Sequence, residues 1–180
     1  MTEIVGQLNF LLSLGVLVAQ VAVLALLVLL FFQRNSPVLD FFGKYGIHFI
    51  FLVSLAGIVT SLVYSEIFGF TPCGLCWLQR VFLYPQAILA GLALLKRDRN
   101  IADYLLSLSV VGALVALYQH YLQMGGTILI DCPAVGVGAD CAKRIVFEFG
   151  YITFPLMSFT VFALIITFAL IVRTRKISNE

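Results

Sequence analysis

The chain has 180 residues, of which 62% are hydrophobic and only 11% are charged, and its formal net charge is +2 at pH 7. Its mean hydropathy is +1.07. Because roughly a quarter of the residues in soluble domains are charged, this composition excludes a soluble globular protein and indicates an integral membrane protein.

Five segments approach the length of about 20 apolar residues that a helix needs to cross the hydrocarbon core of a bilayer. The first could be mistaken for a signal peptide, but its apolar stretch is too long, no Lys or Arg precedes it, and no small-residue cleavage site follows it. We therefore expect an all-α protein with five transmembrane helices, at residues 8–32, 47–65, 77–95, 101–122 and 154–172.

The segments between these helices differ in charge. Segments 33–46 and 96–100 are expected to be short connectors, and with the C-terminal end they hold most of the basic residues: Arg34, Lys44, Lys96, Arg97, Arg99, Arg173, Arg175 and Lys176. The opposite side has Lys143 and Arg144 in its loops. Because cytoplasmic loops retain Lys and Arg, we expect the N-terminus and segments 66–75 and 123–152 on the outer side. All four cysteines then face a compartment in which disulfides persist.

The stretch "TPCGLCWLQR", residues 71–80, leads into the third helix and holds two of the cysteines. Pro72 precedes the pair, so Cys76 is expected at or near a helix N-terminus, where unpaired N–H groups and the helix dipole stabilise a thiolate. Such positions are typical of reactive cysteines. Arg80 lies one helical turn beyond Cys76 on the same face and stays charged, so the guanidinium and the thiolate would share one edge of the bundle.

Other interpretations of Cys73 and Cys76 stay open. The pair could form a structural disulfide, although so short a loop contributes little chain-entropy stabilisation. All four cysteines could bind zinc, but structural zinc sites usually combine two close pairs, and eight residues separate Cys132 from Cys141. We therefore expect no metal site. Arg80 on its own could simply extend to the lipid headgroups.

The long outer loop holds the second cysteine pair, in "DCPAVGVGADC". Its glycines and proline predict a flexible segment in which a Cys132–Cys141 disulfide could move, and a permanent loop disulfide is the alternative. One pair at a helix start and one in a flexible loop suit disulfide transfer by thiolate attack. Further on, "CAKRIVFEF" brings Ile145, Val146 and Phe149 together at helical spacing and predicts a short helix lying flat on the outer membrane surface.

Repeated disulfide formation needs an acceptor for two electrons. The chain has no cysteine on the expected cytoplasmic side and no haem or flavin motif, so a lipid-soluble two-electron acceptor at the membrane edge fits. His120, near the outer end of its helix, could hydrogen-bond such an acceptor or help to move protons. The alternative is an interfacial histidine that anchors the helix beside Tyr118 and Tyr121.

Several of these stretches resemble the DsbB/BdbC family of disulfide-bond formation proteins. The most specific is "CGLCWLQR" followed by "YPQ", and "YQHYLQ" and "FPLMSF" are also similar, so that the resemblance covers residues from about 45 to 172. It implies a transmembrane four-helix bundle over residues 45–180, preceded by an additional N-terminal transmembrane helix and cytoplasmic connector over residues 1–44. This first helix departs from the family pattern, and the close spacing of the second cysteine pair is more like the BdbC branch.

The resemblance also implies an activity. A soluble DsbA-like protein of the thioredoxin fold would form a mixed disulfide with Cys132, and Cys141 would resolve it or pass the electrons to Cys73. Cys76 would face a membrane quinone, ubiquinone or menaquinone, with Arg80 supporting the negative sulfur and His120 as a further candidate for quinone binding. The DsbA–DsbB–quinone system keeps the bacterial periplasm oxidising.

The resemblance further implies a location in the bacterial cytoplasmic membrane, with the cysteines on the periplasmic or extracellular side. The other partners would be membrane lipid and the quinone pool, and we expect no nucleic-acid partner. Two other functions stay open. A structural or adhesion protein would keep both disulfides permanently, and a thiol reductase would carry electrons in the reverse direction. Residue types do not fix that direction, because the relative reduction potentials decide it.

Overall fold

The computed structural model describes residues 2–33, 35–98, 100–127 and 140–177. Within these ranges, five helices are long and apolar enough to cross a membrane. This finding confirms the predicted all-α membrane protein. A π-helical turn, η1, continues the second of them. The elements follow in the order α1 (Thr2–Phe32), α2 (Pro37–Leu62), η1 (Val63–Ile67), α3 (Gly74–Lys96), α4 (Ala102–Gln123), β1 (Phe147–Glu148), β2 (Ile152–Thr153) and α5 (Phe154–Ile177).

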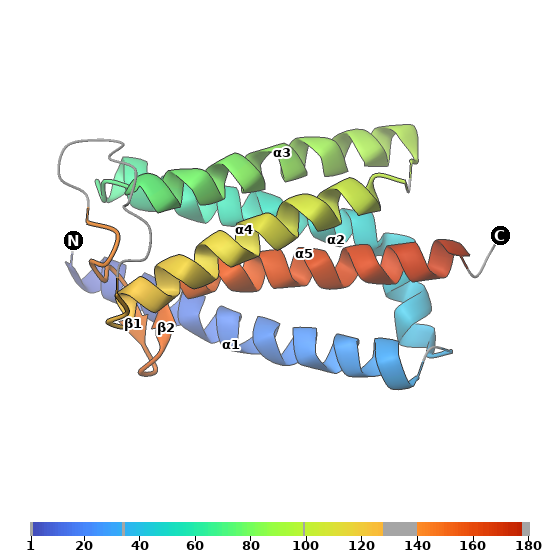
Figure 1. The fold of residues 1–180 in the computed structure, drawn as a ribbon, viewed down its shortest axis with the longest axis horizontal. Helices are drawn as coiled ribbons and strands as arrows, with labels where there is room; N and C mark the ends of the chain where they lie inside the picture. Colours follow the sequence, from blue (N-terminus) through green and yellow to red (C-terminus); the bar gives the residue numbers. More distant parts are fainter. Residues whose placement is uncertain (1, 34, 99, 128–139, 178–180) are drawn as a thin grey trace.

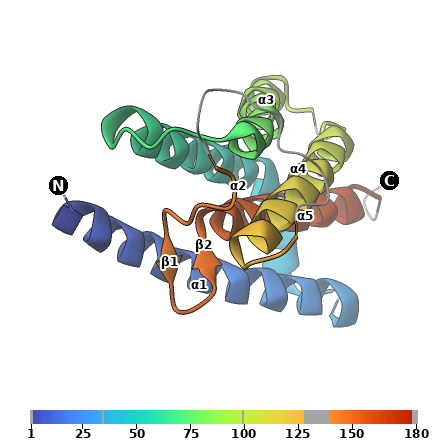
Figure 2. The same ribbon diagram turned by 60° about the vertical axis from the view of Figure 1, so that its left-hand side comes forward.

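Helices α2 to α5 form a four-helix bundle, and α1 packs on its outside against α5 (Figures 1 and 2). α5 is the central helix, because it contacts α1, α2 and α4 and has buried side chains along its whole length. α1 leaves many of its Leu and Val side chains exposed, as suits a helix whose outer face meets lipid tails as apolar as itself. The predicted four-helix bundle with one additional N-terminal helix is therefore confirmed.

Two glycines let helices of the bundle approach one another closely. A Cβ atom at Gly112 of α4 would lie 2.5 Å from the ring of Phe162 on α5, and one at Gly46 of α2 would overlap Val172. Phe162 is fully buried, so its ring fills the notch that Gly112 leaves. Small residues at such crossings are usual between transmembrane helices, whose association depends on close packing.

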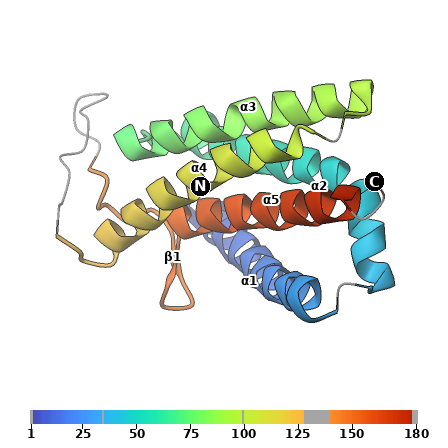
Figure 3. The ribbon, with the colours of Figure 1, turned by 45° about the vertical axis from the view of Figure 1, so that its right-hand side comes forward.

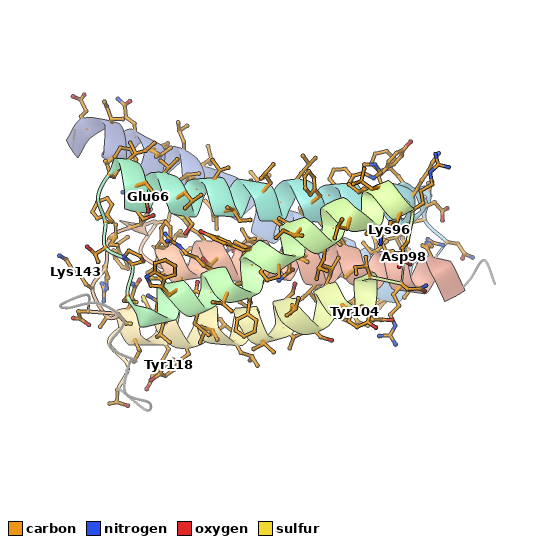
Figure 4. All side chains as sticks on the ribbon, turned by 90° about the horizontal axis from the view of Figure 1, so that it is seen from above. Glu66, Lys96, Asp98, Tyr104, Tyr118 and Lys143 are labelled. Carbon is orange, nitrogen blue, oxygen red and sulfur yellow. The ribbon has the colours of Figure 1, made fainter. Side chains whose placement is uncertain are left out.

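Charged side chains gather at the two ends of the bundle. Lys96 and Asp98 lie at one end, whereas Glu66 and Lys143 lie at the other (Figure 4). The C-terminus is at the first of these ends, and the β1–β2 hairpin projects from the second (Figures 1 and 3). The start of α3, which carries the first cysteine pair, is at the same end as the hairpin (Figure 1).

The structure corrects the predicted surface helix over "CAKRIVFEF". In this segment, Phe147 and Glu148 instead form β1, which pairs antiparallel with β2 so that Phe147 faces Thr153 and Glu148 faces Ile152. Phe149 and Gly150 turn the chain with φ values of 52° and 78°, which a helix cannot accommodate. The segment is also far shorter than the roughly 12 residues at which an unpacked helix becomes even marginally stable.

The structure also corrects the first predicted connector. Only residues 33–36 link α1 to α2, because α2 begins at Pro37 with Ser36 as its N-cap. Proline suits the first helical position, where its missing N–H is not needed. The boundary expected between residues 44 and 45 therefore falls inside a continuous helix, and the division of the chain into two parts stays a prediction.

Candidate active site

The first cysteine pair lies at the start of α3. Cys73 is the N-cap, with φ −77° and ψ 173°, and Cys76 is the third residue of the helix. The predicted place of Cys76 at a helix N-terminus is therefore confirmed. The N–H groups of the first helical turn have no carbonyl partner within the helix, and together with the helix dipole they favour negative charge on a nearby sulfur.

The two thiols of this pair face one another. Cys73 donates a hydrogen bond to the sulfur of Cys76 over a distance of 3.5 Å. This hydrogen bond and burial raise the pKa of the Cys73 thiol far above its ordinary value. Cys73 is almost fully buried, whereas Cys76 is partly exposed. The arrangement favours a protonated Cys73 and leaves Cys76 as the sulfur that carries negative charge.

Gln119 of α4 joins the two sulfurs from the neighbouring helix. Its amide nitrogen lies 3.3 Å from Cys73 Sγ and 3.2 Å from Cys76 Sγ. Gln79 donates a 2.6 Å hydrogen bond to the Gln119 carbonyl oxygen, and this bond fixes which end of the amide faces the sulfurs. Sequence reasoning did not single out Gln119, although it stands in "YQHYLQ" as one of a few polar residues in a mainly apolar helix.

The second cysteine pair meets the first through Cys141. Cys141 is 3% exposed and shares a buried cluster with Cys73, Leu75 and Leu122. A hydrogen bond with the Cys141 side chain also contributes to the raised pKa of the Cys73 thiol. The contact therefore brings one sulfur of each pair together. The predicted partner of Cys141, Cys132, lies outside the described residues.

The Cys141 segment is fixed to the bundle by Gln123, at the end of α4. The Gln123 amide donates hydrogen bonds to the carbonyl oxygens of Lys143, at 3.0 Å, and of Cys141, at 3.4 Å. The Arg144 side chain in turn donates to the carbonyl oxygen of Gln123. These bonds attach the outer loop directly to the helix that carries Gln119.

Arg80 is 7% exposed and its guanidinium points across to α2. It donates hydrogen bonds to Ser61 Oγ at 2.8 Å, to the Ser61 carbonyl oxygen at 2.9 Å and to Ser65 Oγ at 3.0 Å. Ser65 donates to the carboxylate of Glu66 over 2.9 Å, so the positive charge is linked to a carboxylate through one hydroxyl. The guanidinium also lies 5.2 Å from the centre of the Trp77 ring.

The π-helical turn η1 helps to build this arrangement. It places Tyr64 and the adjacent Ser65 on the same cavity wall, although neighbouring residues of a regular helix point about 100° apart. Isolated π turns are frequent at functional sites.

A cavity of ≈ 330 Å³ lies between α1, α2, α3 and α5, and we call it the lateral cavity. Cys76 and Arg80 both line it, as their predicted position on one helical face requires. Most of its wall is apolar. The polar side chains that line it near Cys76 come from α2, η1 and α3: Ser61, Ser65, Gln79 and Arg80.

A second cavity of ≈ 280 Å³, the outer cavity, lies at the loop end of the bundle. Cys73, Cys76 and Gln119 line it together with Asp140 and Lys143 of the outer loop. Cys76 therefore lines both cavities, whereas Cys73 lines the outer one. The Cys76 side chain can therefore be reached both from the lateral cavity and from the outer cavity.

His120 lies apart from the lateral cavity. Its Nδ1 is 2.8 Å from the hydroxyl of Thr153 in β2, and His120 is not among the described residues that line either cavity. The contact joins the end of α4 to the hairpin. A role for His120 at an electron acceptor stays a prediction.

Comparison with known proteins decides the family. Residues 44–172 match the family model described as "Disulfide bond formation protein DsbB". The chain belongs to the DsbB family. It is 42% identical over 133 residues to the SPbeta prophage-derived disulfide bond formation protein B of Bacillus subtilis, covering 73% of this chain and 88% of the relative.

Two further relatives of the DsbB-family chain are informative. Identity is 33% over 128 residues with disulfide bond formation protein C of Bacillus subtilis, covering 69% of this chain and 90% of the relative. Identity is 34% over 139 residues with a probable disulfide formation protein of Chlamydia pneumoniae, covering 77% of this chain and 97% of the relative. No solved structure matches the chain significantly.

Membership of the DsbB family confirms the resemblance and identifies the chain as an oxidoreductase of disulfide bond formation. It favours disulfide bond formation over a structural or adhesion function. The family match begins at residue 44, so α1 lies outside it.

Proposed function

We propose that this DsbB-family protein reoxidises a DsbA-like dithiol protein of the thioredoxin fold and passes the two electrons to a membrane quinone. One observation carries the proposal: Cys76 lines both cavities, while its partner Cys73 contacts Cys141 of the outer loop. Sulfur contacts thus lead from the outer loop to a mainly apolar cavity between the helices.

In the proposed pathway, electrons first pass from the partner to the second cysteine pair. A thiolate of the partner attacks Cys132 of a Cys132–Cys141 disulfide, and Cys141 leaves as a thiolate. The second thiol of the partner then releases Cys132. The partner is oxidised and the pair is reduced by two electrons. The role of Cys132 follows from the family resemblance.

A second exchange passes the electrons on to the first pair. Cys141 attacks Cys73 of a Cys73–Cys76 disulfide and Cys76 leaves as a thiolate, after which Cys132 displaces Cys73 and re-forms the Cys132–Cys141 disulfide. The contact between Cys141 and Cys73 supports this order of attack. The two electrons then reside on Cys73 and Cys76.

The lateral cavity fits a quinone. Its volume of ≈ 330 Å³ falls within the range of about 300–1,000 Å³ usual for small-molecule sites, which are mostly apolar with a few placed polar groups. Arg80 and Ser65 would hold a ring oxygen, Cys76 would face the ring, and the apolar wall would hold the tail. When bound, a quinone supplies an acceptor for the two electrons and two protons whose removal restores the Cys73–Cys76 disulfide.

The residues around Cys76 are suited to hold the negative charge that it carries before it is oxidised. The amide of Gln119 donates toward the sulfur at 3.2 Å, and the start of α3 directs its free N–H groups to the same place. Arg80 adds a permanent positive charge to the shared cavity wall. Hydrogen bonds that involve a charged group are stronger than those between neutral groups.

The proposed orientation places the cysteines on the periplasmic or extracellular side of a bacterial cytoplasmic membrane. It is supported by Lys96, which lies at the end of the bundle opposite the start of α3 (Figure 4), and by Arg175 in the last turn of α5, since basic residues are retained on the cytoplasmic side. Attachment of a membrane-impermeant maleimide to Cys76 in intact spheroplasts, after reduction, tests the orientation.

The activity is tested with purified protein in mild detergent. We expect the wild-type protein to catalyse quinone-dependent oxidation of a reduced thioredoxin-fold protein, followed by the fall in quinone absorbance, with one quinone reduced per partner disulfide formed. Bound quinone is expected in a solvent extract of the protein. Cys76→Ser should abolish quinone reduction but still form a mixed disulfide with the partner.

Cys141→Ser separates the two halves of the pathway. This variant should still pass electrons from a small dithiol, delivered directly to the Cys73–Cys76 pair, to quinone, while losing turnover with the protein partner. If the wild-type protein reduces no quinone with either donor, or if Cys76→Ser turns over at the wild-type rate, the proposed function is wrong.

A further inference from the structure

Helix α1 lies outside the family match, yet it forms one wall of the lateral cavity. Residues 44–172 carry the match, whereas Leu11, Gly15 and Ala19 of α1 line the cavity together with Cys76 and Arg80 of α3. The wall nearest the bilayer is therefore supplied by an element that the matched part of the chain lacks.

Polar side chains on one face hold α1 in this place. Asn9 accepts a buried hydrogen bond from the hydroxyl of Tyr64, which itself lines the cavity. About three turns further along the same face, Gln20 donates to Thr160 of α5 at 3.3 Å and accepts from Tyr151 at 2.9 Å. Polar groups are costly in lipid, so this face is fixed against the bundle and the opposite face is left to the bilayer.

The cavity opens sideways between α1 and α2. Leu11 and Gly15 of α1 and Ala56 of α2 line the cavity and are also exposed, so they form the rim of an opening toward lipid. A Cβ atom added at Gly15 would meet nothing within 4 Å. The small residues Gly15 and Ala56 therefore leave space where two larger side chains would close it.

The cavity is also long in the direction of the helices. The α1 wall extends from Leu11 to Ala19 and the α3 wall from Cys76 to Leu83, which at 1.5 Å per residue corresponds to about 10–12 Å. Gln79 and Arg80 lie close to Cys76, and the rest of the wall is mainly apolar, with the hydroxyl side chains of Thr60, Ser158 and Thr160 among its leucines and valines. This shape matches a molecule with a polar redox head and an apolar chain.

We propose that α1 supplies the binding wall for the apolar tail of the electron acceptor, and that the opening between α1 and α2 is its entrance from the bilayer. The inference rests on the proposed function and names the acceptor class: a quinone whose long apolar chain is bound, in addition to its ring. The α1 wall and the end lined by Cys76 and Arg80 belong to one continuous cavity. A single molecule with a ring and a long apolar chain can therefore contact both.

The test compares two quinones, one without a tail and one with a ten-carbon chain, in steady-state assays with the full-length protein. Gly15→Phe and Ala56→Phe narrow the opening from its two sides, and both replace lipid-exposed residues, so the bundle should still fold. We expect each variant to raise KM for the chain-bearing quinone about tenfold with little change in kcat, because tail binding is lost equally from ground and transition states. KM for the tail-less quinone should stay at the wild-type value.

Gly6→Phe is the matched control, because Gly6 is an exposed α1 glycine that does not line the lateral cavity and whose Cβ would also meet nothing within 4 Å. Both KM values of this variant should equal those of the wild-type protein. The inference is overturned if Gly15→Phe and Ala56→Phe leave KM for the chain-bearing quinone unchanged, raise both KM values equally, or act no differently from Gly6→Phe. In those cases wild-type quinone reduction persists and the proposed function stands. Failure of the wild-type protein to reduce either quinone would overturn both.

Discussion

Gln119 donates its side-chain amide toward the sulfur of Cys76 over 3.2 Å, from a helix that is more than forty positions away in sequence. The same amide is oriented by Gln79, which donates to its carbonyl oxygen, so a hydrogen-bonded pair of buried glutamines presents the Gln119 N–H donor to the cysteine at the start of α3. This relationship ties the redox state of the sulfur to the packing of α4 on α3.

Replacing Gln119 with Leu should slow quinone reduction about tenfold or more. Hydrogen bonds to charged groups contribute about 1.5–3 kcal/mol, and each 1.4 kcal/mol corresponds to about tenfold. Single-turnover oxidation of the Cys73–Cys76 dithiol by quinone measures the effect. Gln86→Leu is the control, since Gln86 is equally buried but accepts a hydrogen bond from Ser109. Equal loss of rate in both variants would show that the effect is only structural.

Cys73 should react with alkylating reagents much more slowly than Cys76 in the reduced protein. The hydrogen bond to Cys76 and burial raise the pKa of the Cys73 thiol, so it stays protonated as the pH rises through the ordinary thiol range, and only the thiolate is nucleophilic. Mass spectrometry after iodoacetamide treatment between pH 6 and pH 9, a range around the thiol pKa of about 8.5, measures the difference.

The comparison variant for this experiment is Cys76→Ala, which removes the sulfur that accepts the Cys73 hydrogen bond. The pKa of Cys73 should then fall toward its ordinary value and its alkylation at high pH should become faster. An alkylation rate of Cys73 that matches that of Cys76 in the wild-type protein would contradict the assignment of the two roles.

Arg80→Gln should raise KM for quinone about tenfold, and Arg80→Lys should have an intermediate effect. Lysine keeps the charge but cannot bond Ser61 and Ser65 in the forked geometry of the guanidinium. Steady-state quinone reduction at saturating dithiol gives KM. Arg173→Gln is the control, because Arg173 is an exposed arginine paired with Asp103 at 3.4 Å at the other end of the bundle. A similar rise in KM for Arg173→Gln would contradict a specific role of Arg80 in quinone binding.

The hydrogen bond between Tyr64 and Asn9 should contribute measurably to the docking of α1. Asn9→Leu leaves the Tyr64 hydroxyl buried without its acceptor, which should lower the free energy of unfolding by about 1–3 kcal/mol. Tyr64→Phe should cost less, and the double variant should be more stable than the sum of the single changes predicts. Thermal unfolding in detergent measures all three, and strict additivity would mean that the two side chains do not interact.

Gly112→Ala should lower stability by about 1–3 kcal/mol, because overpacking of a well-filled core forces displacement. The added Cβ would lie 2.5 Å from the fully buried Phe162 ring. Gly6→Ala is the matched change in open space, where removing a glycine from a helix should raise stability by about 0.5–1 kcal/mol. Thermal unfolding shifts of the same sign in the two variants would contradict the predicted packing of α4 on α5.

The predictions from sequence succeeded for features that the thickness of the bilayer determines. A helix must be about 20 apolar residues long to span the membrane, so all five spans could be recognised. Pro72 and the residues after it indicated a helix start, and Cys76 is indeed the third residue of α3. The segment around Phe149 was predicted wrongly, because its spacing fits a helix while the hairpin is fixed by pairing with Ile152 and Thr153.

The sequence by itself determined the membrane class, the number of helices and the place of the first cysteine pair at a helix start. Only the tertiary structure decided that Gln119 faces the sulfurs, that Cys141 reaches Cys73, and that α1 forms a wall of the lateral cavity. The physical reason is that these helices are apolar on nearly all faces, so no polar stripe reveals how each is rotated about its axis. Rotation and register follow from close packing between helices, and packing becomes visible only when the helices are assembled.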